Sequence, residues 1–223
     1  MSRARRSPTG QMPVALQQPV RRGALEVIRM AVSLGITVSL GHTDASMEVL
    51  RAAIAAGATG FTHLGNGCPR ELDRHDNIIW RVCDATGLTA SLIPDGIHVS
   101  PAPFRLFHRS LENVYYTTDA MAAAGAKAGK YRIGRIEVEV GEDQIVRQPG
   151  KTNFAGSALR PIDGVIRAAR MLNCPWQECW RRMSEAPARF VGLQNEITVG
   201  ASADFCLLQV GPDGMPKLVA EAC

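Results

Sequence analysis

Four residues that could bind a metal or move a proton each follow an apolar, β-rich run of the sequence. They are His42, His63, His98 and Asp119, in the segments 41–44, 62–66, 95–98 and 117–121. In parallel β/α barrels the loops at the carboxyl ends of the strands converge on one pocket. The regular placement therefore predicts one shared site, and its combination of histidine and aspartate indicates metal-dependent hydrolysis.

His42 and His63 are the predicted metal ligands. A hydrolytic metal site needs neutral imidazoles or carboxylates and an open position for water. The two histidines end neighbouring strands, so both could bind one divalent ion, which lowers the pKa of its bound water toward about 7. A buried histidine with satisfied hydrogen bonds is the alternative for either residue alone, whereas the pair favours ligation.

Asp119 and His98 are the predicted proton-transfer and oxygen-binding groups. Asp119 puts a carboxylate at the end of an apolar strand, where it could act as general base toward water and then as general acid toward a leaving nitrogen. His98 could hold a substrate oxygen or stabilise an oxyanion. A supporting or helix-capping role is the alternative for His98.

The loop after His63 offers groups for an anionic substrate. An arginine beside backbone N–H groups can bind a phosphate or carboxylate in a bidentate manner. Arg74 and Arg70 both fit this role, and their spacing does not separate them. His75 and His108 are expected to be surface or loop histidines.

The elements that would position these residues alternate between helix and strand. Apolar periodicity predicts helices over 23–34, 44–56, 78–84 and 101–111, and strands over 36–40, 60–64, 88–93 and 114–118. This order favours a parallel sheet with helical crossovers. Farther along the chain we expect a β-hairpin over 131–140 and 144–147, helices over 161–171 and 175–183, and a strand over 203–210.

These elements predict an α/β fold in three parts. Residues 1–22 contain no acid and several arginines and show no helix or strand period, so we expect a disordered or mis-started leader. Residues 23–200 are predicted to form part of a metal-dependent-hydrolase β/α barrel, with its last four strand units and a hairpin insert over about 131–148. Residues 201–223 are predicted to supply a return strand of a small β domain.

Composition indicates a soluble cytoplasmic protein. The chain has 223 residues, of which 46% are hydrophobic and 21% charged. Five arginines precede the first acid, Glu26, and they account for the formal charge of +4, so no nucleic-acid-binding face is predicted. No apolar run approaches the ~20 residues of a membrane span. The six cysteines form no Cys-x-x-Cys pair, which is typical of reduced thiols.

Together these segments resemble the N-acetylglucosamine-6-phosphate deacetylase family of the amidohydrolase superfamily. The resemblance extends over residues 24–210 and rests on the order and spacing of five strings. They are SLGHTDA (39–45), GFTHLGNG (60–67), LIPDGIH (92–98), TDAMAAAG (118–125) and FAGS (154–157).

The resemblance implies a TIM-type β/α barrel, a small β-sandwich domain and a homodimer. It also implies hydrolysis of the acetamide of N-acetylglucosamine 6-phosphate to glucosamine 6-phosphate and acetate. The implied cofactor is a divalent metal, usually Zn²⁺ and sometimes Fe²⁺, held by His42 and His63, with Asp119 as the catalytic acid and base. The implied substrate contacts are Asn66, Gly67, Arg74, His98, Phe154, Ala155 and Gly156.

The chain departs from the family in two ways. The family's barrel has eight strands and begins upstream, and its glutamate ligand from an early strand has no counterpart here, so residues 1–22 are interpreted as a misplaced or truncated start. The loop 65–77 also differs from the family's arginine-containing turn. The alternatives are therefore an amidohydrolase with another N-acyl or cyclic amide substrate, and an inactive half barrel whose open edges pair with another chain.

Overall fold

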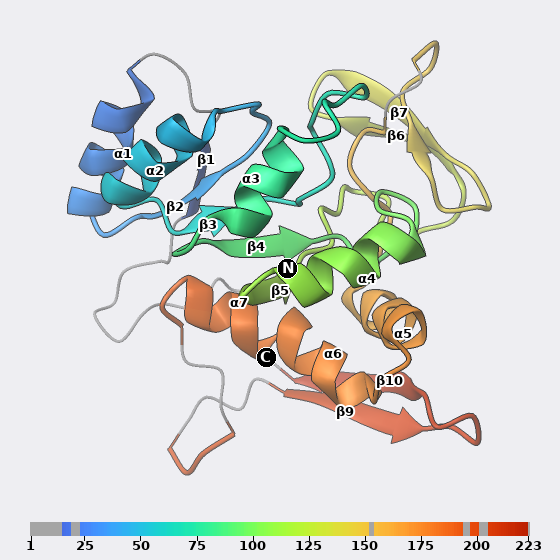
Figure 1. Cartoon of the computed structure of the whole chain (residues 1–223). Coiled ribbons are helices and arrows are strands. Elements are labelled where there is room, and N and C mark those ends of the chain that lie inside the picture. The colour runs from blue at the N-terminus through green and yellow to red at the C-terminus, as the bar shows by residue number, and fades with distance from the viewer. Residues whose placement is uncertain (1–14, 19–22, 152–153, 194–196, 201–204, 223) are drawn as a thin grey trace.

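A five-stranded parallel sheet forms the centre of the structure (Figure 1). The computed structural model describes residues 15–18, 23–151, 154–193, 197–200 and 205–222. The strands lie in the order β1 (Ala15–Gln18), β2 (Thr37–Leu40), β3 (Gly60–Phe61), β4 (Thr89–Leu92) and β5 (Asn113–Tyr116), and every neighbouring pair is parallel. The connecting helices are α1 (Ala24–Ser33), α2 (Met47–Ala55), α3 (Ile78–Asp84) and α4 (Pro101–Ser110).

The sequence supplies start signals for three of these helices. Ser46 Oγ accepts a hydrogen bond from the Val49 amide at 3.3 Å and caps α2. Asn77 caps α3 through its side-chain oxygen, and Pro101 occupies the first turn of α4. Because such groups satisfy or remove free backbone donors, they fix where the loops after β2, β3 and β4 end.

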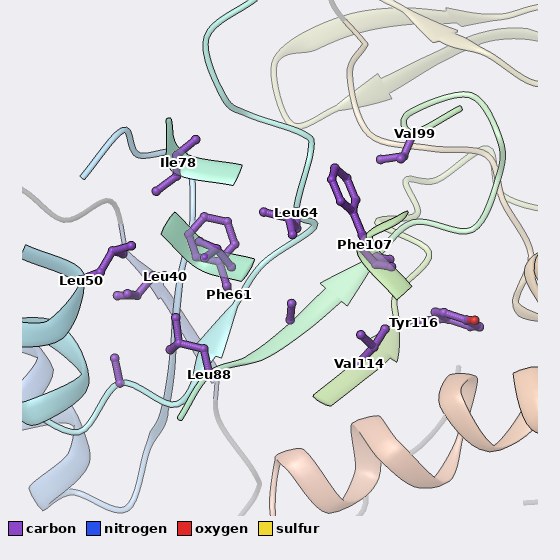
Figure 2. Close-up of a cluster of buried hydrophobic side chains, with 14 of the residues drawn as sticks. Leu40, Leu50, Phe61, Leu64, Ile78, Leu88, Val99, Phe107, Val114 and Tyr116 are labelled. Atoms are coloured by element: carbon purple, nitrogen blue, oxygen red, sulfur yellow. The ribbon is translucent and has the colours of Figure 1, made fainter. Parts of the chain in front are cut away.

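One face of the sheet packs against the helices and forms the main core. Apolar residues alternate along the strands on this face, and Figure 2 shows side chains of β2, β3, α2 and α3 gathered there. The buried strand residues on this face are Val38, Leu40, Phe61, Ala90, Leu92, Val114 and Tyr116. This alternation is the expected pattern for strands with one apolar face.

The opposite face of the sheet carries hydroxyl groups. Ser39 Oγ lies 2.8 Å from Thr62 Oγ1, and Ser91 is 1% exposed. Tyr115 stacks on Phe190, with ring centroids 5.0 Å apart. The polar residues that break the apolar strand patterns therefore share one face, below the strand ends that carry the predicted site.

The prediction of a leader without secondary structure is wrong for residues 15–18. These residues form β1, which pairs with β2 in parallel, with Ala15 opposite Thr37 and Gln18 opposite Leu40. Their sequence shows no strand period, but the edge of β2 presents unpaired backbone groups that a fifth strand satisfies. Residues 1–14 and 19–22 lie outside the described residues.

After β5 the chain forms a small antiparallel sheet and three helices. The sheet contains β6 (Gly129–Ile133), β7 (Ile136–Val140) and β8 (Val146–Arg147), and the helices are α5 (Pro161–Leu172), α6 (Trp176–Met183) and α7 (Glu185–Phe190). The predicted single strand over 131–140 is wrong, because a turn with Gly134 at φ 57° divides it. Helix α7 had no counterpart in the sequence prediction.

The C-terminal strand lies outside the parallel sheet, as predicted. β9 (Phe205–Val210) pairs with β10 (Pro216–Ala222) in an antiparallel hairpin, and Figure 1 shows this hairpin beyond α5 and α6. β10 had no counterpart in the sequence prediction. No helix among the described residues is long and apolar enough to cross a membrane. Cys68, Cys83, Cys174 and Cys179 are free thiols.

Candidate metal centre and active site

The structure brings His42 and His63 together at the carboxyl ends of β2 and β3. Their Nε2 atoms lie 3.1 Å apart, and their rings meet edge to face with centroids 4.8 Å apart. His42 is exposed, whereas His63 is 3% exposed. Because β2 and β3 are parallel neighbours, the loops that leave them start side by side.

The backbone at the predicted site is strained. Among the described residues, five non-glycine residues have positive φ, and three of them are His42 (49°), His63 (35°) and Asp119 (49°). Such conformations are uncommon for residues with a side chain, and they persist only where surrounding contacts hold them. The strain therefore coincides with the three residues assigned to metal binding and proton transfer.

The histidine pair fits a single divalent ion. A zinc–nitrogen bond is about 2.0 to 2.1 Å long, so two nitrogens on one tetrahedral zinc lie about 3.3 Å apart, close to the observed 3.1 Å. Burial is the largest influence on His63 and holds its pKa below its ordinary value, which favours the neutral, ligating imidazole. Within the described residues no group of three or more His, Cys, Asp or Glu side chains could hold a metal. The described part of the chain therefore offers two ligands of such a centre.

Contacts with Gly156 and Ser157 hold Asp119 in place. The Ser157 amide donates to the Asp119 carbonyl at 2.8 Å, and the Met121 amide donates to the Ser157 carbonyl at 2.9 Å. Gly156, at φ 74°, packs against the same carbonyl, where a Cβ would lie at 3.3 Å. The Asp119 side chain is exposed, and its charge raises the pKa of His63, against the stronger effect of burial. The carboxylate thus acts electrostatically on His63.

His98 lies between Asp95 and Phe154. Its Nδ1 is 2.6 Å from Asp95 Oδ2, and its ring centroid is 5.0 Å from that of Phe154. The His98 side chain is 3% exposed, and its Nε2 is buried without a hydrogen-bond partner in the described structure. His98 also acts on the pKa of His63, which it lowers. The predicted residues His98, Phe154 and Gly156 therefore join the site.

Only the first residues of the loop after His63 contact the two histidines. The Asn66 amide donates to the His63 carbonyl at 2.9 Å. Gly67 packs on His42, and a Cβ at Gly67 would lie 2.7 Å from His42 Nδ1. Arg74 is exposed, and in the described residues no hydrogen bond or ion pair joins its guanidinium to the histidine pair. The structure therefore does not place Arg74 at the metal centre.

Two supporting residues had no assigned role in the sequence analysis. Ser91 Oγ accepts a hydrogen bond from the His63 amide at 2.7 Å, and its position on the hydroxyl face of β4 is the signal that could have identified it. Arg81 on α3 donates to Asp44 at 3.0 Å and to Asp76 at 2.6 Å. It therefore ties the loop after β2 to the loop after β3.

The other two histidines have different environments. His75 is exposed, as expected. The expectation of a surface or loop residue is wrong for His108, which lies in α4 and is partly buried, with Nε2 3.0 Å from the Tyr116 hydroxyl. Burial, together with the charge of Arg182, lowers the pKa of His108 to about 4. The side chain packs toward the helix-facing side of the sheet because α4 covers that side.

Comparison with curated proteins and solved structures finds deacetylases. No family model matches the chain. The chain is 34% identical over 215 residues to the N-acetylglucosamine-6-phosphate deacetylase of Vibrio furnissii, covering 92% of this chain and 53% of that protein. It is 33% identical over 193 residues to the Bos taurus deacetylase, covering 82% and 47% of the two chains.

The fold comparison agrees with the sequence comparison. The N-acetyl-D-glucosamine-6-phosphate deacetylase of Mycobacterium smegmatis, in complex with N-acetyl-D-glucosamine-6-phosphate, matches with a TM-score of 0.81 at 30% identity, covering 92% of this chain and 55% of that chain. The Pasteurella multocida deacetylase matches with a TM-score of 0.81 at 28% identity, covering 94% and 55%. The chain spans about half the length of these relatives. By sequence and by fold, the chain belongs to the N-acetylglucosamine-6-phosphate deacetylase family and matches a C-terminal half of its members.

Proposed function

We propose that this chain forms part of a metal-dependent deacetylase that hydrolyses the acetamide of N-acetylglucosamine 6-phosphate. The products are glucosamine 6-phosphate and acetate. The observation that carries the proposal is the 3.1 Å approach of the two Nε2 atoms of His42 and His63. Relatives named for this reaction match most of the chain and support it.

We further propose that the parallel sheet is one part of a β/α barrel, with the β9–β10 hairpin in a small β-sandwich. The uninterrupted order of parallel strands supports the barrel assignment, because barrels repeat this strand-helix unit. The hydroxyl face, with Ser39 and Ser91, would then face the barrel interior. The remaining strands and a glutamate ligand would lie outside this chain.

His42 and His63 would hold the divalent ion, which is zinc in our proposal, with Fe²⁺ as the alternative. When bound, the ion supplies Lewis-acid activation of water and of the acetamide carbonyl. His63 is suited to ligation because burial keeps its imidazole neutral. The strained backbone at both histidines holds the two nitrogens in position before the ion arrives.

Asp119 would move the protons of the reaction. Its carboxylate takes a proton from the attacking water as the new C–O bond forms, and then gives that proton to the amide nitrogen as the C–N bond breaks. The exposed side chain of Asp119 leaves its oxygens accessible to water and substrate. His98 would hold a substrate oxygen through Nε2, which has no partner in the described structure.

The other proposed substrate contacts come from the loop after His63 and from the segment beside Asp119. Asn66 and Gly67 turn beside His63 and His42, and Phe154, Ala155 and Gly156 lie in the segment that pairs beside Asp119. Arg74 is the proposed contact for the phosphate. We also propose a cytoplasmic homodimer, on the resemblance alone.

A binding experiment tests this substrate assignment. We expect the chain to bind N-acetylglucosamine 6-phosphate more tightly than N-acetylglucosamine in calorimetry, with Arg74→Ala losing this preference and Arg70→Ala keeping it. Equal affinity for the two sugars would favour an amidohydrolase with another N-acyl or cyclic amide substrate.

An activity experiment tests whether the chain suffices alone. Because the described residues offer only two ligands, we expect little or no turnover from the isolated 223 residues, whether or not zinc is added. Metal content near one ion per chain together with rapid turnover would contradict the need for a further ligand. Absence of any zinc binding would instead favour the inactive half barrel.

A further inference from the structure

Asp95 is a buried carboxylate at the end of the strand that leads to His98. Its side chain is 2% exposed. Oδ1 accepts hydrogen bonds from the amides of Ile97 at 2.8 Å and His98 at 2.9 Å, and Oδ2 lies 2.6 Å from His98 Nδ1. Arg167 on α5 holds the backbone from the other side, because its Nη1 donates to the Asp95 carbonyl at 3.1 Å.

These contacts define which nitrogen of His98 carries a proton. Burial is the largest single effect on Asp95 and raises its pKa, but the hydrogen bond and charge of His98 and the two amides together hold the pKa of this carboxyl below its ordinary value. The carboxylate is therefore ionised at neutral pH and can only accept hydrogen bonds. Nδ1 of His98 must be the donor in the 2.6 Å contact.

The second nitrogen of His98 is left for a ligand. Nε2 is buried and has no hydrogen-bond partner in the described part of the chain. The ring packs against Phe154, whose segment pairs beside the Asp119 backbone. A buried ring nitrogen without a partner is costly unless a ligand supplies one.

We propose that Asp95 is a positioning residue, which fixes His98 with Nδ1 protonated so that the lone pair of Nε2 is presented as an acceptor to a hydroxyl or amide N–H group of the substrate. This inference rests on the proposed function for the identity of the substrate. In this tautomer Nε2 can accept a hydrogen bond but cannot donate one. Asp95 acts through His98 and touches no reacting atom.

Asp95→Asn tests this role with little change of shape. The two backbone amides hold the oxygen of the new side chain as their acceptor, so its NH₂ group faces His98 Nδ1. A donor then stands where an acceptor stood, and the proton of the neutral ring should move to Nε2. Asp143→Asn is the matched control, because that carboxylate is half-exposed and pairs with Arg147 in the β6–β8 sheet.

The ring protonation is read from imidazole ¹⁵N–¹H correlation spectra of the whole chain. We expect His98 to be Nδ1-protonated in the wild type and in the control, and Nε2-protonated in Asp95→Asn. Titration with N-acetylglucosamine 6-phosphate should shift the Nε2 resonance of the wild type, because a donor of the sugar then hydrogen-bonds to it, and an unchanged resonance at saturation would overturn the proposal. An unchanged tautomer in Asp95→Asn would overturn the proposal. If that variant does not fold, Asp95→Ser keeps a turn acceptor but cannot reach His98 Nδ1, and the same shift is expected.

Calorimetry separates this inference from the proposed function. Asp95→Asn should bind N-acetylglucosamine 6-phosphate at least tenfold more weakly than the wild type, and Asp143→Asn should bind it as the wild type does. A wild type that does not bind this sugar contradicts the proposed function, and the ¹⁵N spectra still decide the role of Asp95. Equal binding by the wild type and Asp95→Asn overturns the positioning role.

Discussion

Replacing Ser91 by alanine should destabilise the chain by leaving one buried amide without a partner. The Oγ atom of Ser91 accepts the His63 amide at 2.7 Å, and both residues are almost fully buried. Removal of one partner of a buried hydrogen bond costs about 1 to 3 kcal/mol. For a chain of this length, each kcal/mol lowers Tm by about 2 to 4 °C, so Ser91→Ala should lower Tm by about 2 to 12 °C.

Ser33→Ala provides the matched control. Its hydroxyl is exposed and donates to the Met30 carbonyl at 2.8 Å, so its loss leaves no buried group unpaired. We expect the control to change the free energy of unfolding by no more than about 0.5 kcal/mol. Urea unfolding of both variants measures the difference, and Tm with and without zinc shows whether His63 still ligates.

Two results would refute this reasoning. Equal unfolding free energies for Ser91→Ala and Ser33→Ala would mean that the His63 amide finds another partner. A destabilised Ser91→Ala chain that retains the full zinc stabilisation would mean that the hydrogen bond supports the fold but does not hold the strained His63 backbone in its ligating position.

Zinc binding, acid sensitivity and loop anchoring each depend on one side chain that can be replaced. His63→Gln should abolish the stabilisation by zinc, which is about 2.7 kcal/mol at 100 times Kd. His75→Gln, at an exposed position, should retain it. Equal stabilisation of the two variants by zinc in thermal scans would contradict ligation by His63. The pKa of His108 is about 4 when folded and about 6.5 when unfolded, so its contribution to stability is full above pH 6.5 and is lost as the pH falls toward 4. Urea unfolding of His108→Gln should therefore show a shallower loss over this range, and an unchanged slope would contradict it. Arg81→Met should lower the free energy of unfolding, because the Arg81 guanidinium is 13% exposed and joins two loops, whereas Arg147→Met should leave it almost unchanged, because that ion pair is exposed. Equal losses in urea unfolding would show that burial does not matter here.

Much of the local structure follows from the sequence because apolar periodicity and end signals agree. Helix α3 begins at Ile78 and ends at Asp84, as predicted, because Asn77 caps it. Strand β1 and helix α7 follow from no such pattern. Pairing with the edge of β2 holds β1, and stacking of Phe190 on Tyr115 holds α7, so both depend on parts of the chain that are distant in sequence.

Some features of the candidate site could likewise be predicted from the sequence, and others could not. The adjacency of His42 and His63 was predictable, because successive parallel strands place their ends at one edge of a sheet. The strained backbone of both residues was not, because nothing in the residue type requires positive φ. The exposed position of Arg74 was also not predictable, since a loop's path depends on what it packs against.

The sequence by itself determined the alternation of helices and strands and the placement of histidine and aspartate where strands end, because both are local patterns of residue type. Only the tertiary structure decided that two imidazole nitrogens meet at 3.1 Å and that Asp95 pairs with the ring of His98. The physical reason is that hydrogen bonds and possible ligand geometry depend on distances of a few tenths of an ångström. Those distances are set by strand register and by side-chain packing between elements that the sequence keeps far apart.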